Sequence, residues 1–175
     1  MTEEIIIAGF GGQGVLFLGE TIARIGMILG KNVSWLPSYG PEMRGGTANC
    51  SVIISDDEIA SPVVFKPSTF FALNRPSFEK FENFVEKNGI ILMNTSLIDL
   101  QGKRDDVIYI SVDATNIASS LGNIKATNMV MLGAYIKYKK LFDLYQVLDF
   151  ISKNSKSKEF FEINKRAVEY GYNSI

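Results

Sequence analysis

Histidine is absent from this chain of 175 residues, and cysteine occurs only once, as Cys50. Without histidine, the sequence offers no imidazole for acid–base catalysis and no histidine ligand for a metal ion. A single cysteine excludes a disulfide within the chain, and it cannot supply the thiolates of an iron–sulfur cluster or a structural zinc site. If the protein takes part in redox or metal chemistry, we therefore expect other chains to hold the metal.

An excess of charge and a long apolar run are missing as well. The 18 basic and 19 acidic residues leave a net charge of -1, so charge does not indicate a nucleic acid or an anionic membrane as partner. No apolar run approaches the ~20 residues of a membrane span, and the start, Met-Thr-Glu-Glu, lacks the basic region of a secretory signal. We expect a cytoplasmic protein that does not bind membranes, with one domain over residues 1–175.

The pattern of apolar residues predicts strands that alternate with helices. The predicted strands are 4–9, 32–36, 47–55, 58–61, 69–73, 90–93 and 107–111, and the predicted helices are 14–29, 76–87, 114–121, 127–140, 143–153 and 158–170. Segments 47–55 and 58–61 are expected to form a hairpin that turns at Asp56–Asp57. The predicted fold is α/β, with a Rossmann-like, mostly parallel sheet flanked by helices and a small antiparallel hairpin as an addition.

A glycine turn joins the first predicted strand to the first predicted helix. Its glycines at positions 9, 11 and 14 have the spacing of a dinucleotide-binding turn, which presents backbone N–H groups to a phosphate at a helix N-terminus. An NAD site would need an acidic residue at the end of the second strand, where this chain has Ser-Trp-Leu-Pro-Ser. A tight turn without any ligand is the alternative. The candidate binding residues are Gly9, Gly11, Gly12, Gln13 and Gly14, and the Gln13 amide suits the orientation of a ligand or of a neighbouring loop.

A second candidate lies in the glycine- and proline-rich loop that follows the second predicted strand. Arg44 could bind a phosphate or carboxylate and Tyr39 could stack, or Glu42 and Arg44 could form a weak pair in a solvated turn. In a parallel sheet this loop emerges beside the glycine turn, at the carboxyl end of the strands, which favours a functional role. The candidate residues of the loop are Tyr39, Glu42, Arg44, Gly45 and Gly46.

Other residues that could carry chemistry have simpler explanations. The pairs Asp56–Asp57 and Asp105–Asp106 fall in predicted turns, where aspartate bonds its own backbone. Cys50 lies in a predicted strand and is expected to be a buried packing residue. Gly133, in the middle of a predicted helix that begins almost entirely apolar, indicates close packing against another element.

Two of these segments, Gly9–Val15 (GFGGQGV) and Ser38–Gly46 (SYGPEMRGG), resemble the gamma subunit, or gamma domain, of the 2-oxoacid:ferredoxin oxidoreductases. The similarity continues in order through Cys50–Ser55, Ser61–Pro62 and Asn128–Ala134. The resemblance implies a Rossmann-like domain that completes a larger assembly close to the place where coenzyme A reacts. The glycine turn and Arg44 would then face either the phosphates of coenzyme A or a partner subunit.

The resemblance also implies an activity and partners. Family enzymes oxidatively decarboxylate a 2-oxoacid, attach the acyl group to coenzyme A and pass two electrons to ferredoxin. Thiamine diphosphate with magnesium and the Fe–S clusters belong to the alpha, beta and delta subunits, so this chain would hold none of them and would be inactive alone. The second segment resembles the 2-oxoglutarate and branched-chain members more than the pyruvate members, and 2-oxoglutarate is favoured. A free-standing nucleotide-binding regulatory module is the alternative function.

Overall fold

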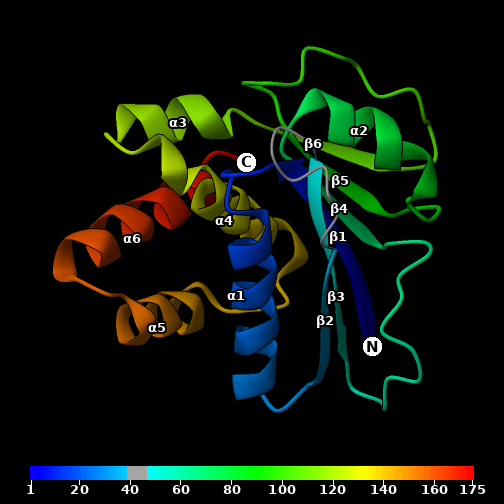
Figure 1. The fold of residues 1–175 in the computed structure, drawn as a ribbon, viewed down its shortest axis with the longest axis horizontal. Coiled ribbons are helices and arrows are strands. Elements are labelled where there is room, and N and C mark those ends of the chain that lie inside the picture. Colours follow the sequence, from blue (N-terminus) through cyan, green and yellow to red (C-terminus); the bar gives the residue numbers. More distant parts are fainter. Residues whose placement is uncertain (39–46) are drawn as a thin grey trace.

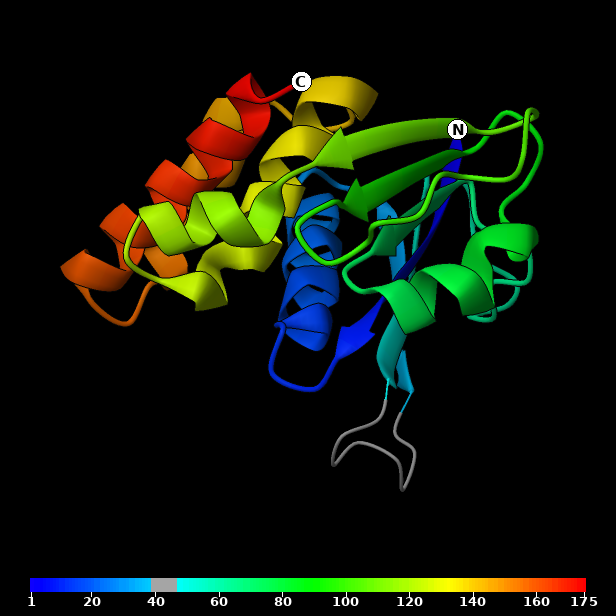
Figure 2. The ribbon, with the colours of Figure 1, turned by 90° about the horizontal axis from the view of Figure 1, so that it is seen from above.

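The computed structural model describes residues 1–38 and 47–175. Strands β1, β2, β3, β4, β5 and β6 form one sheet and span Thr2–Phe10, Asn32–Ser38, Thr47–Ser55, Thr69–Ala72, Ile90–Asn94 and Ile108–Val112. Helices α1, α2, α3, α4, α5 and α6 span Val15–Ile28, Arg75–Phe81, Ala114–Ser120, Thr127–Lys139, Leu144–Asn154 and Lys158–Asn173. The sheet lies between a thick helical layer with α1 and α4 and a thin layer with α2 (Figures 1 and 2). The predicted α/β class is confirmed.

The strand order is β2-β3-β1-β4-β5-β6. β1, β4, β5 and β6 run parallel, whereas β3 is antiparallel to both of its neighbours, β1 and β2. Within β3, Cys50 pairs with Ile7 of β1 and with Pro37 of β2. Because two antiparallel steps restore the original direction, β2 ends at the same edge of the sheet as β1, β4, β5 and β6.

Two predicted elements were wrong. Segment 47–55 does not form a hairpin with 58–61, because β3 pairs along its length with β1 and over seven residues with β2, and 58–61 is not a strand. Because β1 and β2 occupy the two edges of β3, no edge of β3 remains for 58–61 to pair with. The helix predicted over 76–87 ends at Phe81 and continues only as a 3-10 turn, Glu82–Phe84.

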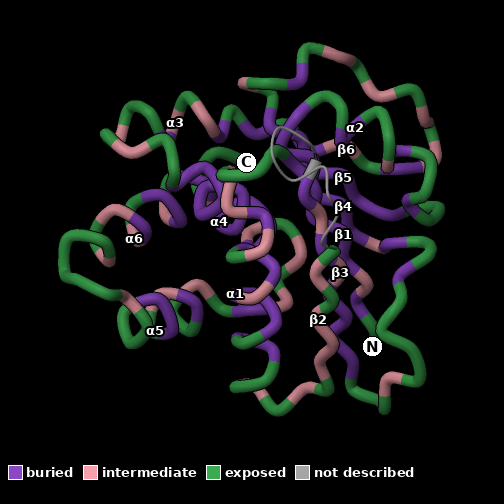
Figure 3. The backbone as a smooth tube through the Cα atoms, viewed as in Figure 1, coloured by how far each residue is buried: buried purple, intermediate pink, exposed green. Residues whose placement is uncertain are grey.

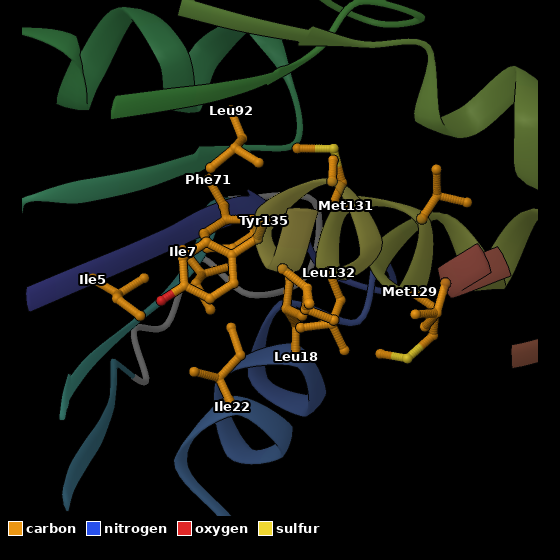
Figure 4. Close-up of a cluster of buried hydrophobic side chains, with 14 of the residues drawn as sticks. Ile5, Ile7, Leu18, Ile22, Phe71, Leu92, Met129, Met131, Leu132 and Tyr135 are labelled. Atoms are coloured by element: carbon orange, nitrogen blue, oxygen red, sulfur yellow. The ribbon is translucent and has the colours of Figure 1, made fainter. Parts of the chain in front are cut away.

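Each face of the sheet has its own apolar core, because successive residues of a strand point to opposite faces. In β1, Ile5 and Ile7 join the core under α1 and α4, whereas Ile6 and Ala8 join the core under α2. Figure 3 shows burial concentrated along the sheet and the inner helices, and Figure 4 shows side chains of the larger core converging between β1, α1 and α4. The two cores fix β1 between helical layers and so fix the position of the turn that follows it.

Helices α4 and α6 approach each other at two glycines. A Cβ on Gly133 would lie 2.0 Å from the carbonyl oxygen of Val168, and a Cβ on Gly171 would lie 1.9 Å from the carbonyl oxygen of Val130. No side chain fits at either position, so the backbones of the two helices are in direct contact. The close packing predicted at Gly133 is confirmed.

Candidate functional site

The glycine turn lies at the carboxyl edge of the sheet, between the end of β1 and the start of α1. The N–H of Gln13 closes the turn by donating to the carbonyl of Phe10 (3.2 Å). Gly12 and Gly14 have φ of 94° and 73°, in the left-handed region that favours glycine. The chain can therefore reverse here and enter α1 without a longer loop.

Gln13 ties this turn to the residues that directly follow strand β4. Its Oε1 accepts hydrogen bonds from the backbone N–H of Phe10 (2.6 Å) and from Asn74 Nδ2 (3.3 Å), and its Nε2 donates to the carbonyl of Leu73 (3.2 Å). A Cβ on Gly9 would lie 2.6 Å from that Oε1, so Gly9 provides the space for the amide. These bonds hold the turn against the segment that follows β4.

Asn128, at the start of α4, holds the other end of the turn. Its Nδ2 donates to the carbonyl of Gly14 (3.2 Å), and a Cβ on Gly14 would lie 2.3 Å from that nitrogen. The two residues are 114 positions apart in the sequence. The sequence contains Asn128 in a segment that resembles the family, but no local pattern predicts its contact with Gly14.

The same edge carries further amide side chains that the sequence analysis missed. Asn74 caps α2 by accepting from the N–H of Ser77 (2.9 Å), and Asn94 donates to the carbonyl of Leu73 (3.1 Å) and to Thr115 Oγ1 (2.8 Å). Their position in the sequence could have identified them, since Asn94 is the last residue of β5 and Asn74 lies two residues beyond β4. Because these bonds are internal, the network stabilises the strand ends rather than facing a ligand.

Gly11 and Gly12 are the part of the turn that internal packing leaves open. Both are exposed, and a Cβ on Gly12 would meet nothing within 4 Å. Gly14 caps α1 without a side chain, and the first turn of α1 contains no acidic residue. The dipole and free N–H groups at such a helix start favour an anion. This exposed pair is the candidate contact surface of the turn.

The second candidate loop lies outside the described residues, together with its candidates Tyr39, Glu42, Arg44, Gly45 and Gly46. Its flanking strands are described: β2 ends at Ser38 and β3 begins at Thr47, which pairs with Phe10. The strand ends therefore lie at the edge of the sheet that carries the glycine turn, as the sequence predicted. β3 stands between β1 and β2, so β2 is not placed as the second strand of an NAD-binding unit would be.

The surroundings of Cys50 and of the aspartate pairs indicate structural roles for these residues. Burial raises the pKa of the Cys50 thiol to about 12, and the side chain is completely buried, which confirms a packing role. Asp56 forms ion pairs with Lys31 and with the N-terminal amine, and Asp106 pairs with Arg104 (2.8 Å). In residues 1–38 and 47–175, no three His, Cys, Asp or Glu side chains are grouped as metal ligands. With one cysteine, the donor set of this chain does not fit an iron–sulfur cluster.

No helix in the described part of the chain combines the length and the apolar character needed to cross a membrane. The fold and the turn define an α/β domain in which a glycine-rich strand-to-helix connection lies at the sheet edge where such folds bind ligands. The pyruvate ferredoxin/flavodoxin oxidoreductase family matches residues 4–174. The chain therefore belongs to that family.

Individual relatives agree with this assignment. The chain is 30% identical over 172 residues to the 2-oxoglutarate synthase subunit KorC of Methanocaldococcus jannaschii, covering 94% of this chain and 92% of that protein. It is 44% identical over 127 residues to the ketoisovalerate oxidoreductase subunit VorA of Methanothermobacter marburgensis, covering 73% of this chain but only 26%, about a quarter, of that protein. The solved gamma subunit of a keto/oxoacid ferredoxin oxidoreductase from Geobacter sulfurreducens superposes with a TM-score of 0.84 at 26% identity, covering 97% and 96% of the two chains.

Proposed function

We propose that this chain is the gamma subunit of a complex that oxidatively decarboxylates a 2-oxoacid, transfers the acyl group to coenzyme A and passes electrons to ferredoxin. The observation that carries the proposal is the family match over residues 4–174. Alpha, beta and delta partners would hold thiamine diphosphate, magnesium and the Fe–S clusters, which supply the decarboxylation and electron-transfer chemistry. This chain would contribute positioning and binding, because its own side chains offer neither histidine nor a set of thiolates.

We place the contact with coenzyme A at the exposed part of the glycine turn, with Arg44 as a second contact. Gln13 and Asn128 hold the turn from inside, so Gly11 and Gly12 are free to face an anionic group. Arg44 lies in the segment between Ser38 and Thr47, whose flanking strands end at the same edge. Phosphate groups of coenzyme A would meet backbone N–H groups and a guanidinium, which both recognise phosphate.

We further propose a substrate from the 2-oxoglutarate or branched-chain group. The segment YGPEMRGG favours this group over pyruvate, with 2-oxoglutarate first. The relatives named above carry both names, and the identity is higher with the ketoisovalerate protein over a shorter stretch. Comparing kcat/KM for 2-oxoglutarate, 2-oxoisovalerate and pyruvate on the purified complex ranks them, and a preference for pyruvate would refute this part.

The first experiment is an anaerobic pull-down of the tagged chain from its own host, followed by an assay of 2-oxoacid- and coenzyme A-dependent dye reduction. Thiamine- and cluster-bearing subunits that co-purify with activity would support the proposal. A chain recovered alone and inactive, with measurable affinity for a nucleotide, would instead support the regulatory module.

Arg44→Ala tests the coenzyme A contact within the active complex. We expect the apparent KM for coenzyme A to rise by about tenfold, as one charge-assisted contact is lost, while the KM for the 2-oxoacid stays constant. Arg166→Ala, at an exposed position of α6, is the matched control and should leave both values unchanged. Loss of assembly would place Arg44 against a partner subunit instead, and an unchanged KM would refute the contact.

A further inference from the structure

Helix α1 carries a stripe of exposed side chains opposite its buried side. Ile22 is completely buried and belongs to the core between the helix and the sheet. In contrast, Phe17, Met27 and Ile28 are 48%, 63% and 69% exposed. Large apolar side chains that gather on one exposed helix face are typical of a contact surface. The stripe begins after Gly14, so the role proposed for the glycine turn does not account for it.

Two opposite charges occupy the middle of the stripe. Glu20 and Arg24 are about half exposed and form a loose pair at 3.6 Å. The positions 17, 20, 24 and 27 are separated by three, four and three residues, so they follow one face of the helix. The stripe is therefore apolar at both ends and charged in the middle.

The stripe has the same spacing when it is followed in either direction. Its midpoint is position 22, with Glu20 and Arg24 two residues to either side and Phe17 and Met27 five residues to either side. When two copies of α1 pack antiparallel about a two-fold axis at this midpoint, each position meets its counterpart on the other side of the midpoint. Glu20 of each copy would then face Arg24 of the other copy, and Phe17 would face Met27, a favourable contact between an aromatic ring and a thioether.

The charges select a second copy among the possible partners. A partner must present a base opposite Glu20 and an acid opposite Arg24 to satisfy both charges at once. The chain itself presents this order when it is turned end to end, whereas parallel helices would place like charges opposite each other. We propose that the stripe, which consists of Phe17, Glu20, Arg24, Met27 and Ile28, is a symmetric interface at which two copies of the chain pair through antiparallel α1 helices.

The size of the stripe sets the strength of this interface. From position 17 to position 28 the helix rises by about 16 Å, and a helix pair of this length lies at the low end of specific interfaces, below about 1,200 Å². We therefore expect a reversible dimer with a Kd of about 10–100 μM. Gly11 and Gly12 lie outside the stripe, so the pairing does not use the surface proposed for coenzyme A.

The test is sedimentation velocity of the full chain over a concentration series that brackets this Kd, and the wild type should associate to a dimer. Arg24→Glu leaves two carboxylates in each stripe, and Glu20→Arg leaves two guanidinium groups. Each variant should dimerise at least about tenfold more weakly than the wild type, because both contacts between the copies become repulsive. An equimolar mixture of the two variants should regain the wild-type affinity, since every contact again joins opposite charges. Recovery in the mixture also separates a lost contact from a lost fold.

Arg75→Glu is the matched control. Arg75 forms the same kind of i,i+4 pair with Glu79, but on α2, in the layer on the other face of the sheet. This variant should dimerise like the wild type. Three outcomes would overturn the proposal: a wild type that stays monomeric throughout the series, a dimer that Arg24→Glu does not weaken, or a mixture of the two folded variants that associates no better than either alone. The first outcome would leave the stripe as a contact for a different subunit.

Discussion

Gly133→Ala should destabilise this protein, although the same change stabilises most helices. In an open helix, alanine in place of glycine contributes about 1 kcal/mol through its higher helix propensity. At position 133, the new Cβ would lie 2.0 Å from the carbonyl oxygen of Val168, 2.7 Å from the N of Tyr172 and 2.9 Å from the carbonyl carbon of Val168. All three obstacles are backbone atoms of α6, so no side-chain rotation can relieve them.

The expected loss of stability follows from the movement of α6 that the new methyl group requires. To restore an ordinary contact, α6 must retreat by more than about 1 Å, and the completely buried Ala167 and Val168 would lose packing. Overpacking costs about 1–3 kcal/mol in typical cores, and a rigid obstacle places this site at or above the upper end. After the gain in propensity, we expect a net loss of about 2 kcal/mol in the free energy of unfolding. For a chain of this size, that lowers Tm by about 4–8 °C.

The assay is thermal and urea denaturation followed by circular dichroism, with Gly26→Ala in α1 as the matched control. A Cβ on Gly26 would meet only side-chain atoms, at 3.1 Å from Val33 Cγ2 and 3.4 Å from two atoms of Ile54. These atoms can shift by a few tenths of an ångström, so we expect a change within about 1 kcal/mol. The reasoning is refuted if Gly133→Ala melts at or above the wild-type temperature, or if Gly26→Ala loses as much stability.

Three further predictions concern polar groups inside or beside the core. The hydroxyl of Tyr135 is completely buried and, among the described residues, has no hydrogen-bond partner. Tyr135→Phe should therefore raise the free energy of unfolding by about 1 kcal/mol in urea titrations. A lower free energy of unfolding would instead show that the hydroxyl has a bound partner. Because burial raises the pKa of Cys50 to about 12, iodoacetamide at pH 8 should modify the thiol only after the chain is unfolded in urea. Mass spectrometry measures the modification, and rapid modification of the native chain would contradict this prediction. The hydrogen bond from Lys31 lowers the pKa of Asp56 to about 2. The contribution of the Asp56 carboxylate to stability is therefore present above about pH 4 and is lost as the pH falls towards 2. Asp56→Asn should flatten this part of the pH–stability curve, and an unchanged curve would show that the pairing is screened by solvent.

The positions of most elements could be predicted because their signals are local. Short apolar runs bounded by glycine or proline marked the strands, and apolar periodicity marked the four helices after residue 113. The role of Gly133 could also be predicted, since a glycine in the middle of an apolar helix has few explanations other than the close approach of another element. The glycine turn was located correctly for the same reason, as its spacing lies within six residues.

Pairing between distant segments could not be predicted. Strand β3 was assigned to the wrong neighbour because its apolar alternation shows that it is buried but does not show which strands flank it. The contacts of Gln13 with Leu73 and of Asn128 with Gly14 join segments 60 and 114 residues apart. An isolated amide in a sequence gives no direction to such a partner, so the bracing of the turn became visible only with the fold.

The antiparallel strand β3 has a consequence for the size of any molecule that touches both the glycine turn and the end of β2. Neighbouring strands lie about 4.8 Å apart, and β3 separates β1 from β2 by one extra spacing. Phe10 pairs with Thr47 and Ser38 with Asn49, so the two residues are also offset by two positions along β3, and a molecule that contacts both must span more than about 10 Å. A coenzyme with a nucleotide and an extended arm, or a polypeptide segment, has the required length. The inserted strand therefore sets the distance that a molecule must span to contact both strand ends.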